Sequence, residues 1–125
     1  MNAKPVPATN RSLTLVGRLM LAEAVTFAIA SILHFGVAES FIGAAIPEAI
    51  IAVVLGAGAI ALMQRGSWWL GLATTLFALA GVIIGLSVIL GGRVSRPVDL
   101  AYHATIFVAL VITVVLLLAR RQTKY

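Results

Sequence analysis

Four long apolar runs constrain the fold of this sequence more than any other feature. Each run is close to the roughly 20 residues that cross the hydrocarbon layer of a bilayer as an α-helix. Helices suit that layer because all of their backbone hydrogen bonds lie within one segment. We therefore expect four membrane-spanning helices, at about residues 15–35, 46–63, 68–90 and 98–119.

The composition favours a membrane protein over a soluble one. Of the 125 residues, 62% are hydrophobic and only 10% are charged. A soluble domain that exposed so much apolar surface would aggregate. The length fits a single domain over residues 1–125, with 1–12 as a polar, flexible cytoplasmic tail. Because cysteine is absent, disulfides, thiolate catalysis and cysteine metal sites are excluded.

The links between the runs are short and carry turn-forming residues. Gly91 and Gly92 end the 68–90 run, and Pro97 opens the run that follows. Pro47 suits the first turn of the 46–63 helix. Short links force neighbouring helices to run antiparallel. We therefore predict an all-α, four-transmembrane-helix bundle of up-down-up-down topology.

The basic side chains divide unequally between the two ends of such a bundle. Of nine Lys and Arg residues, only Arg93 and Arg96 fall on the side opposite the termini. Positive charge concentrates in cytoplasmic loops, so we expect both termini in the cytoplasm and the protein in the plasma (inner) membrane. The basic residues form no stripe with interleaved aromatic residues, and we therefore expect no nucleic-acid partner.

Small side chains recur in the two middle runs, where they let helix backbones approach closely in lipid. Two interpretations remain open. The small residues pack within the bundle, or they dock a homo-oligomer or a larger membrane complex in which this chain is an accessory or structural subunit. The residues concerned are Ala52, Gly56, Ala59, Gly71, Gly81 and Gly85.

Four ionisable residues fall at similar depth on the outer side of the predicted bundle: His34, Glu48, Asp99 and His103. Asp99 and His103 are four residues apart, which places them about 40° apart around a helix and about 6 Å along it. Carboxylate and imidazole groups bind Zn, Fe, Mn or Cu in different geometries. The sequence therefore predicts an outward-facing His/carboxylate site that binds a divalent transition metal through these four residues.

Three other interpretations of these residues remain open. They could form a structural network, since Glu48 and Asp99 in first helical turns complement the helix dipole. His34 and His103 could instead be the axial ligands of a b-type haem, although the carboxylates would repel its propionates. Finally, His103 could be the general base of a small lipid- or quinone-active enzyme, with Asp99 or Glu48 as its orienting carboxylate.

Glu23 is the one acidic residue in the cytoplasmic half of the predicted bundle. It lies on the same face of the 15–35 helix as His34, because eleven residues make almost three whole turns. No other helix offers an acidic or His relay partner at mid-depth, which argues against a pump or a channel. We expect Glu23 to extend to the cytoplasmic interface near Arg18.

Three short segments, ILHFG (32–36), IPEAI (46–50) and DLAYH (99–103), resemble a pattern in small four-helix bacterial membrane proteins that carry no assigned function. The segments lie in the 15–35, 46–63 and 98–119 helices. The chain also resembles, more faintly, DoxX-like four-helix proteins. Both resemblances imply the fold and the membrane placement, and no functional residue follows from either.

Overall fold

The structure is a computed structural model that describes residues 8–36, 42–92 and 97–122. Its four helices are α1 (Ala8–His34), α2 (Ile42–Arg65), α3 (Trp68–Leu90) and α4 (Pro97–Gln122). Each helix contains a segment that is long and apolar enough to cross a membrane. The predicted all-α architecture of four membrane-spanning helices is therefore confirmed.

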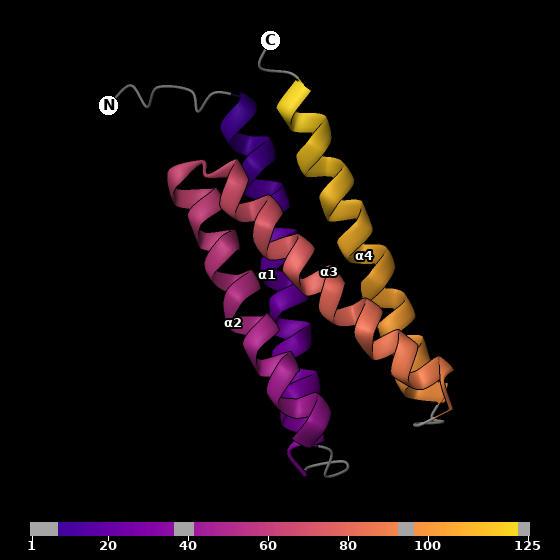
Figure 1. The fold of residues 1–125 in the computed structure, drawn as a ribbon. Coiled ribbons are helices and arrows are strands. Elements are labelled where there is room, and N and C mark those ends of the chain that lie inside the picture. The colour runs from indigo at the N-terminus through magenta and orange to yellow at the C-terminus, as the bar shows by residue number, and fades with distance from the viewer. Residues whose placement is uncertain (1–7, 37–41, 93–96, 123–125) are drawn as a thin grey trace.

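Consecutive helices run antiparallel, so the start of α1 and the end of α4 lie at the same end of the bundle (Figure 1). We call this the terminal end. The opposite end, where α1 finishes and α4 begins, is called the His34 end. The side of the membrane that each end faces stays a prediction. Arg93 and Arg96, the two basic residues predicted to lie opposite the termini, are outside the described residues.

Two helices begin earlier than the hydropathy pattern predicts. The first helix, α1, begins at Ala8 rather than near residue 15, so the end of the predicted 1–12 tail is helical. The second, α2, begins at Ile42, which places Pro47 and Glu48 inside the helix and not in its first turn. Hydropathy marks only the part of a helix that suits hydrocarbon, whereas helical hydrogen bonding continues into the residues on either side.

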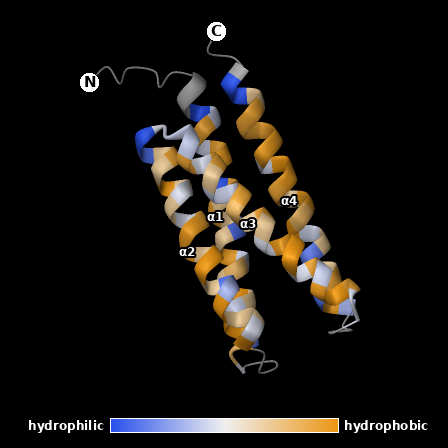
Figure 2. Cartoon of the chain, viewed as in Figure 1, coloured by the Kyte–Doolittle hydropathy of each residue, from blue (hydrophilic) through white to orange (hydrophobic). Residues whose placement is uncertain are grey.

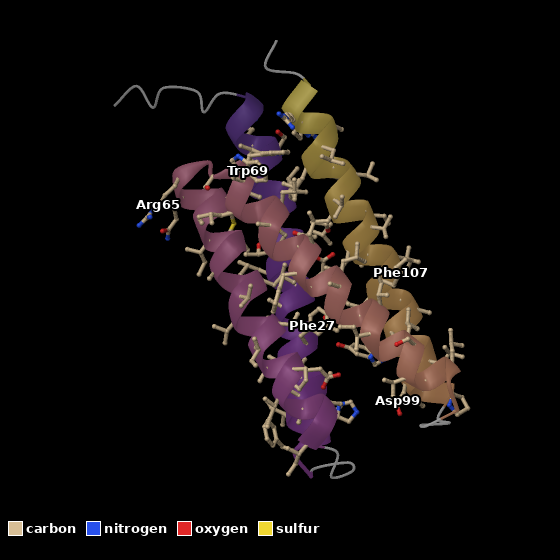
Figure 3. The ribbon with its side chains drawn as sticks, in the orientation of Figure 1. Phe27, Arg65, Trp69, Asp99 and Phe107 are labelled. Carbon is tan, nitrogen blue, oxygen red and sulfur yellow. The ribbon has the colours of Figure 1, made fainter. Side chains whose placement is uncertain are left out.

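Apolar side chains fill the bundle and also cover its outside. Hydrophobic residues dominate the middle of the helices, and hydrophilic residues gather toward their ends (Figure 2). On the outer faces, Val53 is 73% exposed and Val115 is 57% exposed, which fits contact with lipid. Figure 3 shows side chains projecting from both sides of the helices. The large interior side chains that are fully buried include Met20, Phe27, Leu55, Leu110 and Leu117.

The small residues of α2 and α3 are used within the chain. A Cβ added to Gly81 would lie 2.5 Å from the Cδ1 atom of Ile51, so the missing side chain lets α2 and α3 approach closely. A Cβ on Gly71 would contact Leu62 and Leu117, at 3.4 and 3.6 Å. These two glycines therefore support the interpretation in which the small residues pack within the bundle.

The terminal end is tied together by Trp68. Its indole Nε1 donates a hydrogen bond to the backbone oxygen of Leu117 at 2.6 Å, which joins the start of α3 to the end of α4. The guanidinium carbon of Arg121 lies 5.2 Å from the centre of a Trp68 ring, a cation–π contact. These contacts hold α3 and α4 together at the end remote from His34.

Candidate functional site

One imidazole links three helices at the His34 end. The Nδ1 atom of His34 lies 2.7 Å from Oε2 of Glu48, and its Nε2 atom lies 3.7 Å from Oδ1 of Asp99. The side chains of His34 and Asp99 are only 16% and 20% exposed. Three of the four residues that the sequence placed at this end thus come together, from α1, α2 and α4.

The packing of α1 against α2 positions the His34–Glu48 pair. Glu48 is buried on the same face of α2 as Ala45 and Ile51, three residues to either side, which matches the helical repeat. One turn before His34, the hydroxyl of Ser31 donates a hydrogen bond to the backbone oxygen of Ala45 at 2.6 Å. This bond fixes α1 beside α2 at the level where the imidazole meets the carboxylate.

His103 is held differently from the other three residues. Its Nδ1 atom lies 2.8 Å from the backbone oxygen of Asp99, one turn earlier in α4. Its side chain therefore does not converge with the Asp99 carboxylate on one point, as the spacing of four residues had suggested. His103 nevertheless lines the same pocket as His34 and Asp99.

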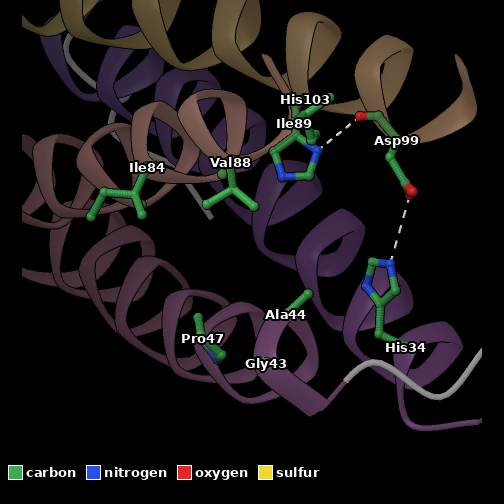
Figure 4. Close-up of a pocket in the computed structure, with 11 residues that line it drawn as sticks. His34, Gly43, Ala44, Pro47, Ile84, Val88, Ile89, Asp99 and His103 are labelled. Atoms are coloured by element: carbon green, nitrogen blue, oxygen red, sulfur yellow. Dashed lines mark hydrogen bonds and ion pairs between the residues drawn. The ribbon is translucent and has the colours of Figure 1, made fainter. Parts of the chain in front are cut away.

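A pocket of about 160 Å³ lies beside this cluster, and we call it the His34 pocket. Figure 4 shows it between α2 and α3, with His34 and Asp99 on one side and His103 above. Its polar groups come from α1 and α4, whereas its walls are apolar or small and come from α2 and α3. The wall residues are Gly43, Ala44, Pro47, Gly81, Ile84, Gly85, Val88 and Ile89.

Two features of the His34 pocket escaped the sequence reasoning. The sequence indicates only a helix-packing role for Gly85, yet a Cβ there would lie 2.6 Å from Nε2 of His103. Pro47 has no amide hydrogen, so the carbonyl of Gly43, four residues earlier, loses the donor that a helix normally supplies. The sequence could have indicated this missing donor, because Pro47 follows residues that are compatible with a helix.

Tyr102 is a further polar residue that the sequence reasoning passed over, although it lies within the segment DLAYH. Its ring packs edge-on against Phe27 and against His103, with ring centres 6.4 and 5.1 Å apart. Within the described part of the chain, its hydroxyl and Oε1 of Glu48 are buried and make no hydrogen bond. The Tyr102 hydroxyl and Oε1 of Glu48 could therefore each form a further hydrogen bond.

The four residues are not arranged as a metal centre in this structure. Among the residues that the structure describes, no three His, Cys, Asp or Glu side chains are grouped closely enough to hold an ion. His34 directs one nitrogen at each of two carboxylates, and His103 engages a backbone oxygen. The predicted metal ligands therefore stay a prediction.

The structure corrects the expectation for Glu23. Its side chain is not extended to the interface near Arg18, because Glu23 is only 3% exposed. Its Oε1 atom lies 2.8 Å from the hydroxyl of Thr113 in α4. A glutamate has a short stem, and the rotation of α1 aims this one at α4 rather than along the helix toward water.

Comparisons with protein-family models, with curated proteins and with solved structures gave no match for this chain.

Proposed function

We propose that this membrane protein binds a small, bilayer-soluble molecule in the His34 pocket. One observation carries the proposal, namely a pocket of about 160 Å³ with His34, Asp99 and His103 at its polar side and apolar walls from α2 and α3. Small-molecule sites are mostly apolar and hold a few well-placed polar groups that orient the ligand. The His34 pocket has that composition.

The size of the pocket fits a ligand that inserts a single ring. An apolar protein cavity of about 150 Å³ accommodates benzene. A pocket of about 160 Å³ is therefore suited to a single six-membered ring, while a longer apolar tail would remain outside. A haem macrocycle is larger than this space, and an absorption spectrum of the purified protein checks the haem alternative directly.

The position of the pocket supports entry from the bilayer. Along α3 its lining runs from Gly81 to Ile89, which corresponds to about 12 Å measured from near the helix end inward. Pro47 and Ile84 line the pocket and are also exposed on the outer faces of α2 and α3, where lipid would lie. With the termini in the cytoplasm, as the charge bias predicts, the pocket would lie in the outer leaflet.

A blocked-pocket variant tests this proposal. We would measure binding of para-octylphenol and octylbenzene to the detergent-purified protein by native mass spectrometry and by thermal stabilisation. Val88→Trp fills the pocket and should weaken binding at least about tenfold. Val115→Trp places the same indole on a lipid-exposed face remote from the pocket lining and should leave binding unchanged. Equal binding by both variants, or none by the native protein, would refute the proposal.

A divalent transition metal is a second candidate ligand, favoured by the spacing of His34 and Asp99. Two ligand atoms on a tetrahedral zinc ion are about 3.4 Å apart, and Nε2 of His34 and Oδ1 of Asp99 are separated by 3.7 Å. Glu48 would then orient the imidazole through Nδ1, as carboxylates do for many metal-binding histidines. Occupancy would fall on acidification, because the imidazole must be neutral to bind the ion.

Elemental analysis of protein purified without chelators tests the metal candidate. Zn, Fe, Mn or Cu near one equivalent per chain, lost in His34→Ala, would support it. Loss in His103→Ala as well would mean that His103 moves to complete the site. A metal-free native protein would remove this candidate and leave the organic ligand.

A further inference from the structure

Resting on the proposed function of the His34 pocket, we infer that its ligand carries a hydroxyl group on its ring, as a lipid-soluble phenol does. The hydroxyl would donate a hydrogen bond to Nε2 of His103. Three observations carry the inference. They are the proton position on the His103 ring, the glycine that leaves room for this ring, and the further acceptors in the pocket lining.

The hydrogen bond of His103 decides which of its nitrogens carries a proton. A backbone carbonyl can only accept, so the contact at 2.8 Å to the oxygen of Asp99 requires a hydrogen on Nδ1. In the neutral ring, Nε2 then holds a lone pair and can only accept. No donor from the described part of the chain satisfies Nε2 of His103. A ligand hydroxyl is the complementary group.

Gly85 leaves room for the His103 imidazole at the His34 pocket. Any other residue at position 85 would place a Cβ about where the imidazole lies, since the distance from an added Cβ to Nε2 is 2.6 Å. Both residues line the His34 pocket. The glycine therefore allows the imidazole to lie against α3 and to line the pocket, where Figure 4 shows His103 above Ala44 and Pro47.

Two other residues of the pocket lining, Gly43 and Asp99, carry hydrogen-bond acceptors. The Gly43 carbonyl lacks its helical donor because residue 47 is proline. Asp99 contributes carboxylate oxygens, and its side chain is partly exposed. The Nδ1 atom of His34 is already paired with Glu48 and does not supply a donor to these acceptors. A ligand that only accepts hydrogen bonds, such as an ether or an ester, would leave these groups unsatisfied.

A neutral donor suits the surroundings of the pocket better than a cation. The walls that contact the ring are apolar, with Ile84, Val88 and Ile89 on α3. A ligand that enters through lipid must shed its hydration, which disfavours an ammonium group far more than a hydroxyl. The ionisable groups facing the pocket are Asp99 and the imidazoles of His34 and His103, so an ammonium compound serves as the contrasting probe.

Ligands of nearly equal shape separate the hydroxyl requirement from pocket binding. We would compare para-octylphenol with para-octylanisole, whose methyl ether cannot donate, and with para-octylbenzylammonium. The native protein should bind the phenol about fivefold more tightly than the anisole, as expected for one neutral hydrogen bond. His103→Phe keeps an aromatic ring but removes the acceptor, and it should abolish this preference.

Each outcome decides the inference. Equal binding of phenol and anisole, lost in Val88→Trp, would overturn the hydroxyl requirement while the proposed function stands. Tighter binding of the ammonium compound would overturn it in favour of a cationic ligand. Absence of binding by all three compounds would contradict the proposed function itself. A preference for the phenol that persists in His103→Phe would show that the hydroxyl donates to another acceptor and not to His103.

Discussion

Oε1 of Glu23 and the hydroxyl oxygen of Thr113 lie 2.8 Å apart in the interior of the bundle, between α1 and α4. The same hydroxyl lies 3.1 Å from the backbone oxygen of Ala109. Threonine has one hydroxyl hydrogen and cannot donate fully to both acceptors. The shorter contact is the main hydrogen bond, in which the Thr113 hydroxyl donates to Oε1 of Glu23, and Ala109 shares the same hydrogen. Burial favours the neutral form of the Glu23 carboxyl group.

The first prediction concerns this neutral acid. Glu23→Gln keeps a donor and an acceptor without a charge, so it should change the free energy of unfolding by less than about 1 kcal/mol. Glu23→Ala removes the partner of Thr113 and leaves a cavity, and should destabilise by about 1–3 kcal/mol. Thermal unfolding in detergent measures both variants. Equal destabilisation by the two would indicate that an ionised carboxylate is required.

The second prediction concerns the bond between Glu48 and His34. Glu48→Ala leaves the imidazole without this buried acceptor and should destabilise the protein by about 1–3 kcal/mol. Glu48→Gln retains an acceptor oxygen and should cost less than about 1 kcal/mol. Gln64→Ala, at an exposed position of the same helix, is the matched control and should be neutral. A neutral Glu48→Ala variant would show that the pair does not hold α1 to α2.

The third prediction concerns Gly85. In Gly85→Ala the new Cβ would meet His103 at 2.6 Å, so the imidazole must move and the protein should lose about 1–3 kcal/mol of stability. Gly56→Ala is the control, because its Cβ would find only Ala24 at 3.8 Å, an ordinary contact. Thermal unfolding gives the stability, and the nitrogen NMR signals of His103 report the displaced ring. Unchanged His103 signals in Gly85→Ala would contradict the close approach.

The fourth prediction concerns orientation. The chain has no cysteine, so single cysteines can be introduced at positions 3, 91 and 123 without background. With the termini in the cytoplasm, a membrane-impermeant maleimide should label only position 91 in intact cells. Labelling of position 3 or 123 in intact cells would reverse the orientation and place the His34 pocket in the inner leaflet.

The sequence predicted the parts of this structure that depend on segment length and register. Runs of spanning length predicted the four helices, and antiparallel order brought His34, Glu48 and Asp99 to one end. The orientation of His103 was not predictable in this way. A spacing of four residues is compatible with a bond from its imidazole to the Asp99 carboxylate or to the Asp99 backbone oxygen, and only the structure shows that the backbone oxygen is the partner.

Helix rotation explains the other differences between prediction and structure. Hydropathy says that a run suits lipid but not which residues face the neighbouring helices, so the burial of Glu23 against Thr113 was missed. The His34 pocket depends on how far α2 and α3 separate, which is set by contacts such as that of Gly81 with Ile51. Such contacts join residues that are far apart in the sequence.

Photo-crosslinking tests the central claim, that the His34 pocket binds a bilayer-soluble ring compound, most directly. An alkylphenol with a diazirine on its ring would be added to the protein in lipid nanodiscs, irradiated, and mapped by peptide mass spectrometry. Label should be concentrated at residues 43–47 and 81–89, displaced by excess para-octylphenol and absent in Val88→Trp. Label spread evenly over the lipid-exposed faces, including Val53 and Val115, and not displaced by excess ligand would contradict it.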